Sequence, residues 1–343
     1  MSSLTFGLWI IRHGETVANK TLQIQGQTES PLTELGRRQA ELCGSASVLN
    51  NLVFSHAYSS DLSRAFDTCR LILEANDVEQ KCQVVKDPRL REKMYGYLEG
   101  KASEILHRAA AKAKVSAYVY TPEGGEELIQ VYRRMREAFV SICDTICQHI
   151  ASSNYSLNHQ FRVQMTETSA QIQRCFPRWP EAFKGRSGKK SKQRVLQSGG
   201  NLQGTTNCNS DPIPQKDCDN GCEALLYAKE DGQKAEQEQQ QQLCLDANVL
   251  MVAHGACIRE LFRCFVDEFD CDSFVGGKGG ALRPLDNTAI SGFLVRISDE
   301  PSDIEAELAD SFRVLTDSSC RTIRVGCLCS HAKNHLDKIQ ADG

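Results

Sequence analysis

The stretch LWIIRHGET at residues 8–16 decides the fold, because a short apolar run passes directly into charged residues and a glycine. An apolar run of this length, followed at once by polar residues, predicts a buried strand that ends at the edge of a sheet. In an open α/β sheet, ligands bind at the carboxyl ends of the strands. We therefore expect Arg12 and His13 to lie at a ligand-binding edge.

A second strand is predicted at residues 249–253, and it too is followed by a histidine and a glycine, His254 and Gly255. A single histidine at a strand end is more often structural than catalytic. Two histidines in equivalent settings, one of them preceded by Arg12, favour a functional site. We expect both imidazoles to face one crevice.

The rest of the chain alternates between strand and helix patterns. Further strands are predicted at residues 54–59, 82–85, 290–297 and 322–327. Helices are predicted at residues 33–50, with Thr33 as the N-cap, and at 62–74, 103–113, 126–150 and 257–265. This order predicts an α/β fold of three layers (αβα), with a mostly parallel central sheet between helices.

The composition limits the class of protein. The 343 residues carry a formal net charge of -4, which gives no overall attraction to nucleic acid or to an anionic membrane. The first residues lack the features of a secretory signal, and no stretch is long enough to span a bilayer. We therefore expect a cytoplasmic protein with no nucleic-acid partner and no membrane span, and a nuclear or mitochondrial location stays open.

The 16 cysteines are scattered along the chain, which favours reduced thiols over a disulfide framework. Cys143 and Cys147 are four residues apart, as are Cys218 and Cys222, and neither pair matches a common zinc pattern. We predict neither a metal site nor a cofactor.

We expect one domain over residues 1–343, with its core at 5–150 and 246–300 and a C-terminal extension at 301–343. A segment at 151–245, rich in Gln, Ser and Lys, interrupts it. Such a composition predicts a disordered insertion, because it cannot bury enough apolar surface to offset the entropy of ordering. The composition of a basic block at 184–194 favours a solvated loop. A nuclear localisation signal or a binding site for a protein partner stays open as an alternative.

Two further residues suit phosphate chemistry. The predicted strand that ends in YSSDLSRA (residues 58–65) places Arg64 in the first turn of the next helix, where backbone N–H groups also favour anions. The planar guanidinium can hold two phosphate oxygens at once. In the turn DPRLREKMYG (87–96), Glu92 is the candidate general acid, although the local sequence fits a surface charge almost as well.

These residues suggest one mechanism for phosphoryl transfer. Neutral His13 attacks phosphorus in line, while Arg12, Arg64 and His254 hold the phosphoryl oxygens. Glu92 protonates the leaving oxygen and then draws a proton from the water that hydrolyses the phosphohistidine. The reaction depends mostly on positioning and electrostatics, and it needs no metal.

The motifs RHGET (12–16), SSDLSRA (59–65), LRE (90–92) and HG (254–255), in this order, resemble those of the histidine phosphatase superfamily. The resemblance covers about residues 5–150 and 246–300. It implies a phosphoglycerate mutase-like fold. It also implies that His13 is the nucleophile, Arg12 and Arg64 the pocket arginines, Glu92 the acid and His254 the second histidine.

Within the superfamily, the stretches at 24–27, 89–96, 99–101 and 121–126 are similar to the TIGAR branch. That branch is regarded as hydrolysing fructose 2,6-bisphosphate, which lowers glycolytic flux and favours the pentose phosphate pathway. The candidate substrate-binding residues are Asn19, Gln25, Gly26, Lys93, Tyr95, Lys101 and Gly255. Locally, Lys93 and Lys101 are candidates to neutralise a second phosphate, although each fits an ordinary solvated lysine at least as well.

Two other functions stay open. The same pocket would serve a phosphoglycerate mutase or a phosphatase of 2,3-bisphosphoglycerate, so the substrate class is a small phosphorylated sugar or glycerate. A non-catalytic scaffold that binds a protein partner through residues 151–245 is the second alternative. It is disfavoured because all five catalytic positions are filled.

Overall fold

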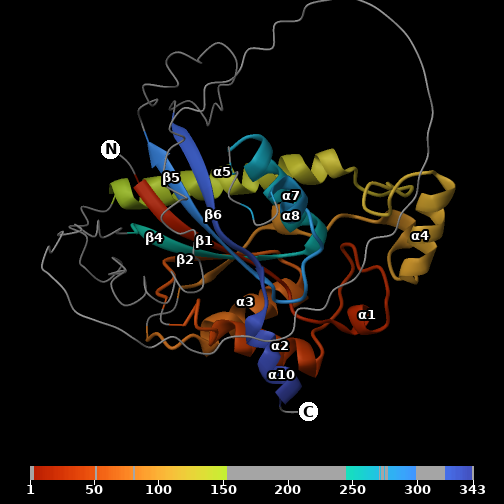
Figure 1. Cartoon of the computed structure of the whole chain (residues 1–343), viewed down its shortest axis with the longest axis horizontal. Coiled ribbons are helices and arrows are strands. Elements are labelled where there is room, and N and C mark those ends of the chain that lie inside the picture. The colour runs from red at the N-terminus through yellow and green to blue at the C-terminus, as the bar shows by residue number, and fades with distance from the viewer. Residues whose placement is uncertain are drawn as a thin grey trace, which may run out of the picture. The chain divides into compact units, whose positions relative to one another are not determined.

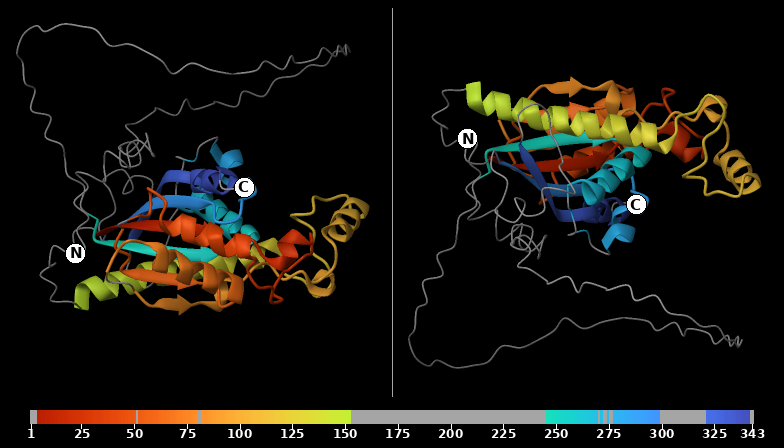
Figure 2. Two further views of the ribbon diagram at one scale, coloured as in Figure 1. Left: turned by 90° about the horizontal axis from the view of Figure 1, so that it is seen from below. Right: turned by 90° about the horizontal axis from the view of Figure 1, so that it is seen from above.

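A computed structural model describes residues 4–50, 52–79, 82–152, 245–269, 271, 274, 277–298 and 321–341. Its described helices lie on both faces of a central sheet (Figures 1 and 2). The strands are β1 (Leu4–Arg12), β2 (His56–Ser59), β3 (Val84–Lys86), β4 (Ala247–Ala253), β5 (Ile290–Ser298) and β6 (Thr322–Ala332). They pair in the order β3-β2-β4-β1-β5-β6.

The first four strands in this order run parallel, and β5 and β6 each pair antiparallel with their inner neighbour. The longer helices are α2 (Glu34–Gly44), α3 (Ser63–Ala75), α4 (Ser103–Lys112), α5 (Leu128–Ser152) and α7 (Gly255–Asp267). The shorter ones are α1 (Val17–Lys20), α8 (Gly277–Ala281), α10 (Asp337–Ala341) and the 3₁₀ turns η1 (Pro88–Leu90), η2 (Gly96–Leu98) and η4 (Asn334–Leu336). The predicted α/β fold with a mostly parallel sheet is confirmed.

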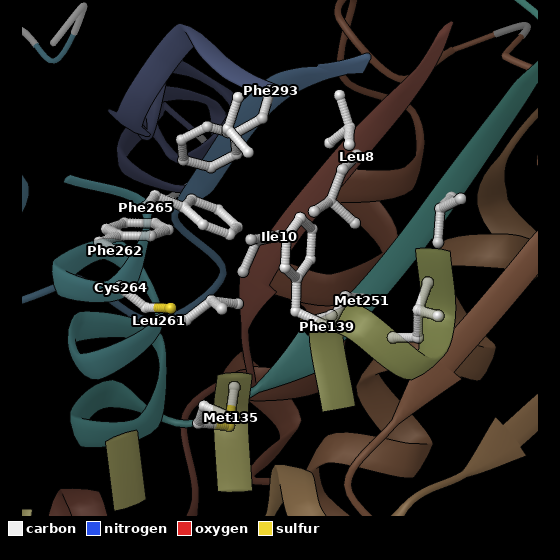
Figure 3. Close-up of a cluster of buried hydrophobic side chains, with 14 of the residues drawn as sticks. Leu8, Ile10, Met135, Phe139, Met251, Leu261, Phe262, Cys264, Phe265 and Phe293 are labelled. Atoms are coloured by element: carbon white, nitrogen blue, oxygen red, sulfur yellow. The ribbon is translucent and has the colours of Figure 1, made fainter. Parts of the chain in front are cut away.

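The alternation of side chains along β1 explains the layers. Leu8 and Ile10 face one side, where they belong to a core cluster with apolar residues of α5 and α7. Figure 3 shows this cluster, in which the rings of Phe139 and Phe265 lie 4.8 Å apart, centroid to centroid. Trp9 faces the other side, toward α2 and α3. β1 is therefore buried on both faces, as a central strand of a parallel sheet must be.

α2 ends six residues before the predicted stop. A Cβ at Gly44 would overlap the backbone carbonyl of Ile72, so the end of α2 lies in close contact with α3. The hydroxyl of Ser45 donates to the carbonyl of Glu41 at 3.1 Å, which caps the last turn. The chain then turns, with Leu49 N donating to Ala46 O at 2.8 Å. The apolar periodicity that predicted a longer helix continues in this turn, because Leu49 is still buried.

α4 lies beyond the carboxyl ends of the central strands, beside α1 (Figures 1 and 2). Two backbone bonds connect its start to the loop after α1: Ile24 N to Lys101 O at 2.9 Å and Ser103 N to Leu22 O at 2.9 Å. Ile24, Leu98 and Leu106 form a small core cluster there, separate from the two that line the sheet.

The C-terminal part contributes β6 to the sheet, and this strand continues to Ala332, beyond the predicted residue 327. The expected insertion at 151–245 lies outside the described residues, apart from the last two residues of α5 and Leu245. The basic block and the pair Cys218 and Cys222 lie outside them as well. The division into one domain with an insertion therefore stays a prediction.

Across the described ranges, no helix is long and apolar enough to cross a bilayer. The same ranges contain no group of three or more His, Cys, Asp or Glu residues that could hold a metal ion.

Two glycines set the distance between α2 and the turn that follows β1. A Cβ at Gly14 would lie 2.5 Å from the carbonyl oxygen of Gly36, and a Cβ at Gly36 would overlap the carbonyl of Glu15. Both obstacles are backbone atoms, which cannot rotate away. α2 therefore supports the start of the site through direct backbone contact.

We predict that Gly36→Ala lowers the free energy of unfolding by about 1–3 kcal/mol, the usual cost of overpacking. Gly279→Ala is the control, because Gly279 also lies in a helix and a Cβ there meets nothing within 4 Å. It should be neutral or slightly stabilising, as Ala replaces Gly in a helix. Urea unfolding measures both variants, and equal effects would show that the α2 contact tolerates a side chain.

Candidate active site

The parallel pairing of β1 with β4 brings the two predicted histidines together. Arg12 is in register with Ala253, and His13 N donates to Ala253 O at 3.0 Å. The rings of His13 and His254 lie 5.1 Å apart, centroid to centroid, and the two residues are 2% and 0% exposed. The two imidazoles thus lie side by side and buried at the carboxyl ends of adjacent strands, where the sequence predicts that they face one crevice.

The hydrogen bonds of His13 identify its tautomer. Its Nδ1 lies 2.7 Å from the carbonyl oxygen of Gly14. Because a carbonyl can only accept, Nδ1 must carry the proton in the neutral ring. The lone pair is then on Nε2, the nitrogen that a nucleophilic imidazole uses.

His254 has the opposite tautomer. Arg64 Nε donates to its Nδ1 at 3.3 Å, and a guanidinium N–H cannot accept, so Nδ1 holds the lone pair and Nε2 the proton. This Nε2 is buried and has no hydrogen-bond partner among the described residues. Next to the lone pair of His13, the site therefore offers an unused N–H donor.

The two arginines come from different elements. Arg64 is the second residue of α3 and is fully buried, and its terminal nitrogens donate to Thr28 O at 2.8 Å and Gly26 O at 2.7 Å. Arg12 ends β1 and donates through Nη1 to Leu285 O at 2.5 Å. The Nε of Arg12 is buried without a partner among the described residues.

The surroundings keep both imidazoles neutral. Burial, and then the charges of Arg12 and Arg64, lower the pKa of His13 well below 6.5. Burial, and then the charge of Arg64, lower the pKa of His254 in the same direction. A proton on either ring would add a buried positive charge beside two arginines.

Glu92 lies at the amino end of α7, the helix that follows His254. Its carboxylate accepts from Ala256 N at 3.2 Å and from Lys93 N at 2.8 Å. A Cβ built on Gly255 would lie 3.7 Å from Arg12 Nε and 3.9 Å from Glu92 Oε2, so Gly255 lies between the two charged groups. The structure thus brings Arg12, Glu92 and Gly255 together, with the partly exposed Glu92 carboxylate held by two backbone N–H groups.

The loop after His13 contains three of the predicted substrate-binding residues. Asn19 belongs to a capping box with Thr16, and Thr16 Oγ1 also lies 3.0 Å from Gln25 Oε1. Gly26 accepts from Arg64 and has a φ of 53°, a left-handed conformation that suits glycine. This loop therefore contacts Thr16, which follows His13 closely, and the arginine of α3.

The other predicted substrate-binding residues lie differently. Lys93 is fully buried, and its ammonium donates to Tyr120 O at 2.7 Å and Tyr118 O at 3.3 Å, which fixes the loop that precedes α5. The same ammonium lies 5.3 Å from the ring of Tyr95. Lys101 is exposed, with its ammonium 4.6 Å from the ring of Tyr97.

Three further residues that contact the predicted site residues or the loops around them were not predicted. Asn287 donates to His13 O at 2.9 Å and lies 3.4 Å from Asn19 Oδ1. Arg134 donates to the backbone around Glu92. Arg259, on α7, lies 3.6 Å from the ring of Tyr118, and its buried Nε has no partner in the part of the chain described. Of the three, Arg259 is the one that the sequence could have indicated, because it lies five residues after His254 on a predicted helix.

Comparison with known proteins gives consistent results. Residues 8–151 match the model of the histidine phosphatase superfamily (branch 1). Fructose-2,6-bisphosphatase TIGAR of Mus musculus is 30% identical over 339 residues, which cover 97% of this chain and 97% of that protein. The Xenopus tropicalis protein of the same name is 29% identical over 339 residues, with 98% and 97% covered.

A solved structure, mycobacterial hydrolase 2, aligns with a TM-score of 0.50 at 19% identity and covers 100% of this chain and 98% of that one. At this identity the likeness concerns the fold alone. The relatives match over nearly the whole chain, and both their names and that of the family describe phosphatases. The chain is therefore a phosphoric monoester hydrolase that belongs to branch 1 of the histidine phosphatase superfamily.

Proposed function

We propose that the chain hydrolyses fructose 2,6-bisphosphate to fructose 6-phosphate through a covalent phosphohistidine on His13. The observation that supports this most is a buried, neutral His13, with its lone pair on Nε2, beside the unused N–H donors of Arg12 and His254. The choice of substrate is supported by the two relatives named fructose-2,6-bisphosphatase. Such a reaction would lower glycolytic flux and favour the pentose phosphate pathway.

In the first step, Nε2 of His13 attacks the phosphorus of the 2-phosphate. The N–P bond forms as the ester P–O bond breaks, and Glu92 gives its proton to the leaving oxygen. The phosphorylated ring is cationic, and the hydrogen bond from Nδ1 to Gly14 O stabilises it. Arg12, Arg64 and the Nε2–H of His254 hold the phosphoryl oxygens.

In the second step, water attacks the phosphohistidine. Glu92, now a carboxylate, takes a proton from the water as the new P–O bond forms and the N–P bond breaks. His13 returns to its neutral state with the proton still on Nδ1. Each group therefore ends the cycle as it began, and inorganic phosphate leaves.

The second phosphate of the substrate needs a cation of its own. Lys93 is held by two backbone carbonyls, whereas Lys101 has an exposed side chain. Arg259 contributes a buried Nε without a partner among the described residues. We assign the second phosphate to Lys101 and Arg259, and we retain Lys93 and Tyr95 as residues that shape the loop around it.

Two other functions would use the same structure. A phosphoglycerate mutase or a 2,3-bisphosphoglycerate phosphatase needs the same nucleophile and the same donors. The mutase differs because it must keep water away from the phosphohistidine until the bound substrate has reoriented in the site. A scaffold that binds a partner through residues 151–245 would need none of these donors.

We predict that the purified protein releases phosphate from fructose 2,6-bisphosphate in the presence of a chelator, and that His13→Ala abolishes the release. His107→Ala is the control, because His107 is exposed on α4, and it should leave the rate unchanged. Faster release from 2,3-bisphosphoglycerate would make that ester the preferred substrate. Isomerisation of 3-phosphoglycerate would show that the protein is a mutase and not a phosphatase. No release from any ester would favour the scaffold.

The rate should be bell-shaped in pH, because His13 must be neutral while Glu92 holds a proton. Burial and the two arginines lower the pKa of His13, so the decline in kcat/KM that reports its protonation should lie below pH 6.5. Glu92→Gln should lower the rate by about 10²- to 10⁴-fold, because the leaving oxygen loses its proton donor. A variant with the parent's profile and rate would show that another group is the acid.

Stability should also depend on the buried imidazoles. The folded pKa of His254 is far below its unfolded value near 6.5, so below that pH the unfolded chain binds the proton and the folded chain does not. The stability that this residue contributes is complete above pH 6.5 and is lost as the pH falls, by about 1.4 kcal/mol per unit.

We predict that the free energy of unfolding of His254→Gln falls less steeply between pH 6.5 and 5.5 than that of the parent. Urea unfolding at several pH values measures the slope. His107→Gln, at an exposed position, should keep the parent slope. The same slope in all three proteins would mean that His254 takes up a proton without cost in the folded state.

A further inference from the structure

The general acid lies on a segment that regular secondary structure does not hold. Glu92 lies between η1, which ends at Leu90, and η2, which begins at Gly96. A proton donor is effective only if its geometry is fixed, and a displacement of about 1 Å can cost about 10²-fold in rate. Side chains from other elements must therefore position this turn.

Arg134, on α5, uses all five of its N–H donors at this turn. Its Nη1 donates to Arg89 O and to Arg91 O, each at 2.6 Å, and its Nη2 donates to Glu92 O at 3.2 Å. The two remaining donors go to the carboxylate of Glu126, from Nε at 2.6 Å and from Nη2 at 2.9 Å. One guanidinium thus holds three carbonyls of this turn, two upstream of the acid and one belonging to the acid itself.

Glu126 holds the downstream side. Its Oε2 accepts from Met94 N at 3.2 Å, and its own backbone N donates to Met94 O at 2.9 Å. The side chains of Arg134 and Glu126 are only 16% and 15% exposed. Together they fix the backbone on both sides of Glu92 without touching its carboxylate.

The first turn of α7 completes the arrangement. Cys257 Sγ donates to Arg91 O at 2.6 Å, and Ala256 N donates to the Glu92 carboxylate at 3.2 Å. The carboxylate is therefore aligned by α7, while the backbone that carries it is fixed by α5. Movement of α5 relative to α7 would move the acid relative to His13.

We propose that Arg134 and Glu126 form a positioning pair that sets the location of the general acid for proton transfer to the leaving group. This rests on the proposed function, in which Glu92 is that acid. A positioning role differs from a purely structural one in a measurable way. It slows substrates whose leaving oxygen needs a proton, and it leaves p-nitrophenyl phosphate almost unaffected, because p-nitrophenoxide departs without one.

The test is the single-turnover rate of phosphoryl transfer to His13, measured as release of the alcohol from an alkyl ester and of p-nitrophenol from the aryl ester. The alkyl ester is fructose 2,6-bisphosphate or 2,3-bisphosphoglycerate, whichever the parent cleaves faster. Arg134→Lys keeps the charge but offers three donors in place of five. It should slow the alkyl ester by about 10- to 100-fold and the aryl ester by less than about threefold.

Glu126→Gln is the second variant, in case the first does not fold, and it should give the same selective loss. Arg133→Lys and Glu127→Gln are matched controls, because both residues are neighbours with exposed side chains. They should keep both parent rates. Equal slowing of the two esters by Arg134→Lys and Glu126→Gln would overturn the positioning role and leave a structural one.

Glu92→Gln separates this inference from the proposed function. If Glu92 is the acid, this change alone slows the alkyl ester selectively, and adding Arg134→Lys to it causes no further selective loss. A further selective loss in the double variant would mean that Arg134 acts other than through Glu92. If Glu92→Gln slows both esters equally, the assignment of the acid fails, and the positioning role fails with it.

Discussion

The site depends on the parallel pairing of β1 with β4. These strands are about 240 residues apart in sequence, yet their register places His13 next to His254. Side chains alternate between the faces of a strand, so a slip of one residue would turn every side chain of β1 to the opposite face. The buried alternation of Leu8, Trp9 and Ile10 between two cores makes such a slip costly. The hydrophobic pattern of the strand therefore also fixes how His13 and His254 lie relative to each other.

The arginines of this protein are buried in two different ways. Arg12 and Arg64 donate to backbone carbonyls and to His254, and no carboxylate of the described residues forms an ion pair with either of them. Arg134 instead forms an ion pair with Glu126. Unpaired positive charge in a buried site attracts a phosphoryl dianion strongly, because little water screens it. The paired arginine supports the backbone, and in the proposed mechanism the other two hold the phosphoryl oxygens.

Much of this could be predicted from the sequence. Short apolar runs followed by His13 and His254 identify strands and their ends, and Arg64 follows from the strand before it. Glu92 was ambiguous locally and was assigned with the help of family motifs. Its position depends on the contact between its turn and α7, which no local pattern records.

The contacts that the sequence does not indicate are made with backbone atoms of distant segments. Asn287 and Arg134 act on carbonyls that lie far away in the chain, and every residue type has a carbonyl, so no pattern marks the partner. Lys93 looked like a solvated lysine, and it is buried because two carbonyls of the Tyr118–Tyr120 loop accept from it. The early end of α2 likewise follows from its contact with α3.

The central position of β1 has a consequence for biosynthesis. β1 leaves the ribosome well before both of its neighbours, β4 and β5, which are made about 240 residues or more later. At translation rates of about 5–20 residues per second, this delay is on the order of 10–50 s. During that time an apolar strand has no native partner on either edge, and such edges promote aggregation. Until β4 and β5 have been synthesised, this apolar segment of the nascent chain is therefore exposed to aggregation.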